Sequence, residues 1–121
     1  MLKRIVVGKP RTETIPPENR IIDPEVYRQC ETAVVESNQL EISYVDKSGN
    51  ETTRVVDPHG MMIQTPLWYL LVHDHKRDAP RFFRLDRIKH TKVDPLTTFL
   101  ARDPREIFTE IQVYSLEMNP N

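Results

Sequence analysis

The sequence has few of the residues that cross-link chains, wrap phosphates or span membranes. It contains one cysteine and three glycines in 121 residues, and no long apolar run. A single cysteine, Cys30, excludes an internal disulfide, and three scattered glycines do not form a glycine-rich phosphate-binding loop. No apolar run approaches the roughly 20 residues of a membrane-spanning helix, and Ile5–Val7 is too short for a secretory signal. We therefore expect a cytoplasmic protein without membrane contact.

The residues that are present suit one small globular domain. Hydrophobic residues make up 38% and charged residues 29% of the chain, which is typical of a folded domain with one modest core. The formal net charge is −1, but its distribution is uneven. From Arg54 to Lys92, eight Lys/Arg accompany four Asp, so this span carries +4 and the remainder −5. The basic span suits an anionic partner, although a solvated hairpin surface would show the same pattern.

A helix is predicted near the start of the chain. Residues 1–22 contain three prolines and scattered charge, which favours an extended linker, with Ile5–Val7 available as an edge strand. Asp23 and Pro24 form a strong helix start, because the Asp23 carboxylate can accept from free N–H groups and proline fits the first turn. Apolar residues at helical spacing extend this helix to about Ser37 and place Cys30 on its buried side.

Short apolar segments separated by turn signals follow the helix, and their alternation predicts strands. The predicted strands are 40–44, 52–56, 61–63, 67–72, 81–85 and 89–93. Turns are predicted at Asp57–Gly60 and Asp74–Pro80. This spacing predicts a small antiparallel sheet that curls into a barrel. Beyond it, Asp103 begins a short helix, and Gln112–Leu116 alternates weakly as a last strand.

Catalytic and metal-binding patterns are weak. His73 and His75 would lie on one face of a strand, as metal ligands can, but no third ligand is expected nearby and the segment resembles a solvated turn. His59 and His90 are single histidines without a serine or cysteine nucleophile motif. We therefore predict no enzyme, no metal site and no cofactor.

Aromatic and basic residues alternate in the second half of the chain. Trp68 and Tyr69 are adjacent on a predicted strand, so they point to opposite faces. Arg84 lies on the opposite face from its neighbour Phe83, and Arg87 follows a bend. Arginines beside aromatics can grip phosphate and stack on bases. The alternative is that the aromatics are core residues and the arginines form structural ion pairs with Asp57 or Asp86.

These blocks resemble the WYL domain family. The tripeptide Trp68-Tyr69-Leu70 gives that family its name, and it stands between the blocks 54–60 (RVVDPHG) and 83–88 (FRLDRI). The helix start at Asp23–Glu25 and the segment Leu40–Tyr44 also resemble the beginning of the family's domain. The resemblance covers roughly Ile22–Val93.

The resemblance implies a mainly β fold, a five-stranded antiparallel Sm-like β-barrel preceded by a helix. We assign it to 23–94, between a lead-in at 1–22 and a short C-terminal extension with one helix at 95–121. It implies the effector-sensing part of bacterial transcription regulators, whose helix-turn-helix domain would stand in a longer chain or a partner. The implied effector is a nucleic acid or nucleotide, with single-stranded DNA a known type. The ligand-binding residues it implies are Tyr69, Arg84 and Arg87, together with Tyr44, Arg54, His59 and Trp68.

Two features depart from the family pattern. The position of His59 is often tyrosine in the family, and no helix-turn-helix stands ahead of the first helix in this chain. A second function therefore stays open, in which the domain is an interaction module that forms a homodimer and binds no small ligand of its own.

Overall fold

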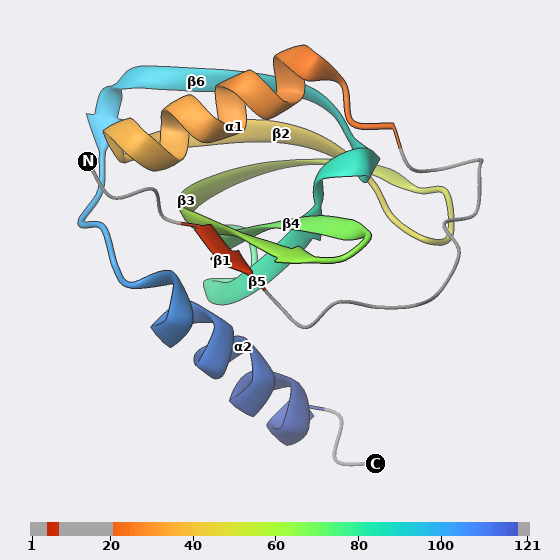
Figure 1. Cartoon of the computed structure of the whole chain (residues 1–121), viewed down its shortest axis with the longest axis vertical. Coiled ribbons are helices and arrows are strands. Elements are labelled where there is room, and N and C mark those ends of the chain that lie inside the picture. The colour runs from red at the N-terminus through yellow and green to blue at the C-terminus, as the bar shows by residue number, and fades with distance from the viewer. Residues whose placement is uncertain (1–4, 8–20, 119–121) are drawn as a thin grey trace.

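The computed structural model describes residues 5–7 and 21–118, with side chains described from 21 to 113. Strands dominate the chain, with a helix near each end (Figure 1). The elements are β1 (Ile5–Val7), α1 (Pro24–Glu36), β2 (Asn38–Val45), β3 (Glu51–Gln64), β4 (Leu67–Asp74), β5 (Ala79–Arg84), the 3-10 turn η2 (Leu85–Arg87), β6 (Ile88–Thr98) and α2 (Pro104–Met118). Among the described residues, no helix is long and apolar enough to cross a membrane.

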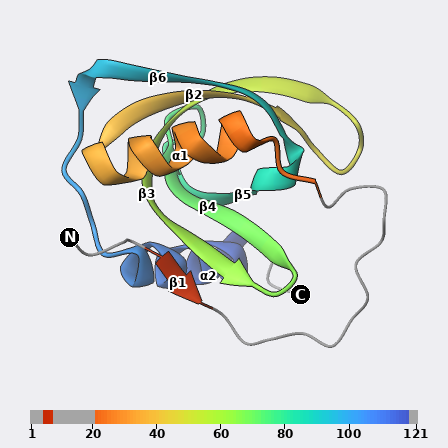
Figure 2. The ribbon, with the colours of Figure 1, turned by 45° about the horizontal axis from the view of Figure 1, so that its top comes forward.

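The strands form one curled sheet in the order β5-β4-β3-β2-β6, with neighbours antiparallel. β1 adds to it by pairing in parallel with β3, as the edge strand predicted at Ile5–Val7. α1 contacts β2, β3 and β6, whereas α2 contacts β1, β3, β4 and β5. Figure 2 shows the two helices on opposite sides of the curled sheet, with β1 beside α2.

The predicted Sm-like barrel is not confirmed. β5 and β6 are the two ends of the strand order, and no pairing joins them among the described residues. The mainly β fold with flanking helices is confirmed. β5 and β6 follow each other in the chain through η2, but β6 pairs with β2 and not with β5 among the described residues, so the sheet is open.

The start of α1 is as predicted. The Asp23 carboxylate accepts from the backbone N–H groups of Glu25 at 2.8 Å and Val26 at 3.4 Å, which satisfies donors that have no partner within the helix. The helix ends at Ser37, whose φ of 56° is left-handed. Cys30 is fully buried, and burial raises the pKa of its thiol to about 12.

The turn predicted at Asp57–Gly60 is wrong, because β3 runs through it. The first half of β3 pairs with β2 and the second half with β4, and the register shifts between Pro58 and Gly60. Such a bulge lets one strand bend while it remains in the sheet. The residues that suggested a turn therefore mark the point where β3 changes partner.

The strand predicted at Gln112–Leu116 is also wrong, because α2 continues to Met118. The helix begins as predicted, with the Asp103 carboxylate accepting from the Arg105 N–H at 2.9 Å. Ile107 and Ile111 are buried at a spacing of four residues, so the helical period overrides the weak alternation that follows it.

The core has two parts, one on each side of the sheet. The larger part lies beneath α1 and includes Leu40, Ile42, Leu70 and Phe83. The smaller part consists of Met62, Leu71, Ile107 and Ile111, with Tyr69, Phe82 and Phe108 packed against it. Because Tyr69 and Trp68 belong to different parts, their predicted opposite orientation is confirmed.

Candidate ligand-binding site

The junction of β5 and η2 is built around an Arg84–Asp86 ion pair. Arg84 donates from Nε to Asp86 Oδ1 at 3.0 Å and from Nη2 to Oδ2 at 2.7 Å. The two side chains are 15% and 6% exposed. The bond to Asp86 is the main reason that the pKa of Arg84 is raised. This bidentate pair fixes the guanidinium and neutralises much of its charge. It is one of the structural ion pairs that the sequence left open as an alternative.

Two tyrosines flank Arg84. The Tyr44 hydroxyl accepts from the Arg84 backbone N–H at 3.3 Å, and the Tyr44 ring packs edge-on against Phe83 at 4.7 Å. Tyr69 is the cross-strand neighbour of Arg84, so both point to the α2 side of the sheet. Its ring packs against Phe82 at 5.1 Å. Tyr44 and Tyr69 therefore both lie beside Arg84 in a well-packed corner of the sheet, with Tyr44 packed in the larger core and Tyr69 in the smaller one.

Arg87 lines a hollow of about 420 Å³ beside this corner. The hollow lies between η2, the start of β6 and the turn that joins β2 to β3. Its lining is Ile21, Val45, Asp46, Lys47, Gly49, Asp86, Arg87 and Lys89. No aromatic side chain is among these described lining residues, so the predicted aromatic-lined groove is not formed here by Tyr69 or Trp68.

The charges around this hollow do not balance. Asp46 accepts from the backbone N–H groups of Ser48 and Asn50, both at 2.9 Å, and the contacts with Asn50 are the main cause of its lowered pKa. Asp86 is engaged by Arg84. Within the described residues, Lys47, Arg87 and Lys89 form no salt bridge, although Arg87 lies near enough to Asp46 to help lower its pKa. Three cations and two carboxylates line the hollow, so its net charge is positive, as a phosphate site should be.

Of the three cations that line this hollow, the sequence predicts Arg87 as a ligand-binding residue and does not predict Lys47 or Lys89. Lys47 lies in the β2–β3 turn, 40 positions before Arg87, and only the folded sheet brings that turn to η2. The sequence predicts Lys89 at the start of a strand and within the basic span from Arg54 to Lys92, but does not single it out as a ligand-binding residue. It lies at a register shift between β2 and β6, where the regular alternation of faces is interrupted.

Arg54 lies in a different cluster. Its Nη1 is 2.5 Å from Asp74 Oδ2, and Arg81 Nη1 is 3.4 Å from the same oxygen. Both guanidiniums lie over the Phe83 ring, at 5.9 and 4.8 Å from its centroid. Arg54 is 9% and Asp74 0% exposed. Sequence reasoning missed Asp74 and Arg81. The sequence does contain a signal for the burial of Asp74. It continues the strand alternation in which Leu70 and Val72 point into the core.

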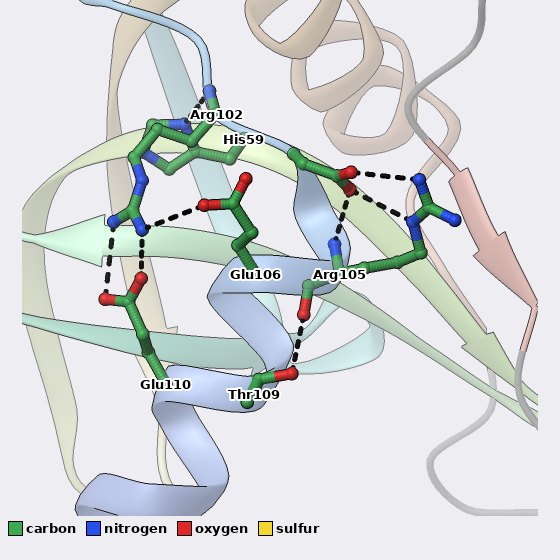
Figure 3. A network of polar contacts seen from close by, with 7 residues as sticks. His59, Arg102, Arg105, Glu106, Thr109 and Glu110 are labelled. Atoms are coloured by element: carbon green, nitrogen blue, oxygen red, sulfur yellow. Dashed lines mark hydrogen bonds and ion pairs between the residues drawn. The ribbon is translucent and has the colours of Figure 1, made fainter.

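Trp68 and His59 also make packing contacts. Trp68 meets Tyr27 of α1 edge-on at 5.7 Å. His59 is 3% exposed, its Nδ1 accepts from the Arg102 backbone N–H at 3.2 Å, and its ring meets Phe99 at 4.9 Å. Figure 3 shows His59 directly beneath the turn that leads into α2. His59 thus ties β3 to the segment between β6 and α2.

A polar network secures the first turns of α2 around that contact (Figure 3). The Arg102 guanidinium lies between Glu106 and Glu110 and pairs with both. Arg105 pairs with the capping Asp103, and the Thr109 hydroxyl donates to the Arg105 carbonyl at 3.0 Å. These exposed pairs help to orient the helix, while its buried face supplies most of the stabilisation.

His73 and His75, at the end of β4, each contact a different carboxylate. His73 Nε2 is 3.0 Å from Asp78 Oδ1, and His75 Nε2 is 2.8 Å from Asp57 Oδ1. The two rings are 5.5 Å apart. In the part of the chain that the structure describes, no group of three or more His, Cys, Asp or Glu residues is arranged to hold a metal ion.

Comparison with known proteins agrees with the sequence blocks. A family model described as "WYL domain" matches residues 25–93. Protein PafB of Mycobacterium tuberculosis and of Mycobacterium bovis are each 51% identical over 37 residues, which cover 31% of this chain and 11% of PafB. The solved structure of the proteasome accessory factor B/C (PafBC) of Arthrobacter aurescens superposes with a TM-score of 0.57 at 25% identity. That match covers 67% of this chain and 13% of PafBC, so the chain spans only a small part of either relative.

Proposed function

The chain belongs to the WYL domain family, and from this premise we propose that it is the effector-sensing domain of a transcription regulator. The proposed effector is a nucleic acid or nucleotide, and single-stranded DNA is the form to be tested first. The domain is assigned to residues 23–94, with a helix-turn-helix domain elsewhere in a longer chain or in a partner. The chain covers only a small share of PafB and PafBC, which supports the proposal that sensing and DNA binding belong to different domains. The direct link from β5 through η2 to β6 supports an Sm-like arrangement of the strands.

The observation that carries this proposal is the hollow at η2 with its three cations. Arg87 can offer a two-pronged guanidinium to a phosphate, and Lys47 and Lys89 add compact charges. Asp86 is already held by Arg84, so it does not compete for Arg87. In this assignment Arg84 positions η2, and Tyr44 and Tyr69 brace the strands on either side. Arg54, His59 and Trp68 support the site by holding β3 and β4 in place.

Removing two of these cations should weaken binding of short single-stranded DNA and reduce its salt dependence. We expect the Arg87→Ala/Lys89→Ala double variant to lose affinity, with the log–log salt slope reduced by about 0.7 for each lost phosphate contact. Fluorescence anisotropy of a labelled oligonucleotide at several salt concentrations measures both quantities. The cause is the loss of counterion release, which follows directly from phosphate neutralisation.

The matched control removes the same charge from another turn. Lys76 and Arg77 are exposed in the β4–β5 turn, so the Lys76→Ala/Arg77→Ala variant has the same net charge as the test variant. It should bind nearly as the unchanged protein does. Equal losses in both variants would show that binding depends on overall charge, and the site at η2 would be wrong.

A second function, homodimerisation, is favoured by two exposed leucines at the end of β6. Leu96 lies in the irregular stretch between the paired residues Asp94 and Thr98, and Leu100 follows the strand. Leu96 is 92% and Leu100 87% exposed, and the Asp94 carboxylate accepts from the Leu96 N–H at 3.0 Å. If this segment forms an interface, light scattering should show a dimer whose dissociation is favoured by Leu96→Ser/Leu100→Ser. A monomer at all concentrations would exclude this function for the chain.

A further inference from the structure

The hollow at η2 holds more positive charge than one internal phosphate of a DNA strand would neutralise. Its charged lining residues are Lys47, Arg87, Lys89, Asp46 and Asp86. Arg84 binds both carboxylate oxygens of Asp86 and so belongs to the same group of charges. With Arg84 included, the group has four positive and two negative side chains, and its net charge is +2. An internal phosphodiester of DNA carries a single negative charge.

The two carboxylates of this group are engaged mainly by other donors than the three lining cations. Asp86 is 6% exposed and is held by Arg84. Asp46 Oδ1 accepts from two backbone N–H groups of its own turn, both at 2.9 Å. The Asn50 N–H is the largest cause of the lowered pKa of Asp46, and the charge of Arg87 is the smallest cause that lowers it. The guanidinium of Arg87 and the two ammonium groups therefore keep donors for a ligand.

The uncharged part of the lining makes charge the main source of affinity. It consists of the aliphatic side chains of Ile21 and Val45 and of Gly49, and no aromatic is among the described lining residues. Bases therefore have no ring to stack on, although stacking is the usual source of affinity that does not depend on phosphate. The hollow lies where the β2–β3 turn and η2 meet at one end of the sheet (Figure 1). Its volume of about 420 Å³ is within the roughly 300–1,000 Å³ of small-ligand sites, which suits one nucleotide residue.

We propose that the hollow at η2 binds the terminal phosphate of a DNA strand, a phosphate monoester, in preference to an internal phosphodiester. This specificity rests on the proposed function, because it names the part of the effector that the same site recognises. A monoester carries a charge of about −1.5 to −2 at pH 7 and has three acceptor oxygens, which matches the net charge of the group. The Arg87 guanidinium binds two of these oxygens as a fork. Lys47 and Lys89 bind the third, and the terminal sugar packs against Ile21 and Val45.

The test uses short single-stranded oligonucleotides of one sequence that differ only at their ends. The ends are a 5′-phosphate, a 3′-phosphate, a 5′-phosphate blocked as its methyl ester, or hydroxyls alone. Each competes with a labelled oligonucleotide for the whole chain, and fluorescence anisotropy gives its affinity. We expect a terminal phosphate to raise affinity roughly tenfold, the effect of one more charge-assisted hydrogen bond, and the methyl ester to lose most of that gain. The end that gives the gain identifies whether the site accepts 5′ or 3′ ends.

Two outcomes would overturn the proposal, and they differ in what they say of the proposed function. If all four oligonucleotides bind equally, and binding still depends on salt and on Arg87 and Lys89, the site binds internal phosphates and only the preference for a terminal phosphate is wrong. If none of them binds at low salt, the proposed binding of single-stranded DNA is wrong as well.

A pair of lysine variants separates this site from a general effect of charge. Lys47 and Lys76 are both exposed and lie in turns between strands, so Lys47→Ala and Lys76→Ala each remove one positive charge from a similar position. Lys47→Ala should remove most of the preference for the phosphorylated end, whereas Lys76→Ala should leave that preference unchanged. Circular dichroism checks that both variants are folded. A preference that falls equally in the two variants, or in neither, would refute the assignment of the terminal phosphate to the hollow at η2.

Discussion

Replacing Asp74 with alanine is expected to lower the free energy of unfolding by about 3–5 kcal/mol, because it breaks a buried ion pair by removing one partner. Asp74 is fully buried and its Oδ2 is shared by Arg54 and Arg81. Its Oδ1 also accepts from the Lys76 backbone N–H at 3.1 Å. In the variant, the Arg54 side chain, 9% exposed in the unaltered protein, would remain buried without a counter-charge and beside the like charge of Arg81. Urea unfolding followed by circular dichroism measures the loss.

Asp78 provides the matched control for this prediction. It is also an aspartate at the β4–β5 turn and also pairs with a basic side chain, His73, but its side chain is 93% exposed. Exposed pairs contribute about 0–1 kcal/mol. Asp78 has a φ of 50°, which asparagine tolerates and alanine does not, so the control variant is Asp78→Asn, and it should change stability little. If Asp74→Ala cost no more than Asp78→Asn, Asp74 would not hold the two arginines in the manner described.

Ile107→Ala should detach α2 from the sheet, at a cost of about 2–5 kcal/mol for a buried isoleucine. Ile107 is fully buried and belongs to the smaller core with Met62, Leu71 and Ile111. The larger core lies across the sheet and shares none of these residues. We therefore expect faster hydrogen exchange in α2, while the fluorescence of Trp68, the single tryptophan, is unchanged because it packs on Tyr27 beneath α1.

Val113 offers a control on the same helix. It is 49% exposed, so Val113→Ala removes little buried surface, and alanine favours the helix. Its effect should stay within about 0.5 kcal/mol. A change in Trp68 fluorescence on Ile107→Ala equal to that of complete unfolding would show that the two cores do not behave separately, and the separation of α2 would then be wrong.

Much of the local structure follows from the sequence. Asp23 and Asp103 both mark helix starts, because a carboxylate at this position satisfies free N–H groups regardless of what surrounds the helix. Trp68 and Tyr69 are adjacent on a strand, so the two-residue period of the strand alone places their side chains on opposite faces. The errors arise where a tertiary contact decides. Asp57–Gly60 has turn chemistry but becomes a bulge within β3, because β4 and β2 bind the two halves of that strand.

The candidate site shows the same division. The blocks around Trp68-Tyr69-Leu70 identify the family, and the basic character of residues 54–92 is a property of the sequence alone. The sequence alone does not determine which arginine is available for a ligand. Arg54, Arg84 and Arg87 are equivalent in the sequence, yet Asp74 engages the first and Asp86 the second, leaving Arg87 beside Lys47.

The sequence by itself therefore determined the two helix starts, the alternating faces of the strands and the family. It did so because these depend on residues a few positions apart, whose geometry the backbone period fixes. Only the tertiary structure decided that Asp74 engages Arg54, where β3 bends and where the hollow at η2 lies. The Arg54–Asp74 pair joins residues 20 positions apart and the hollow joins Lys47 to Arg87, 40 positions apart, and no local period relates such positions until the sheet has formed.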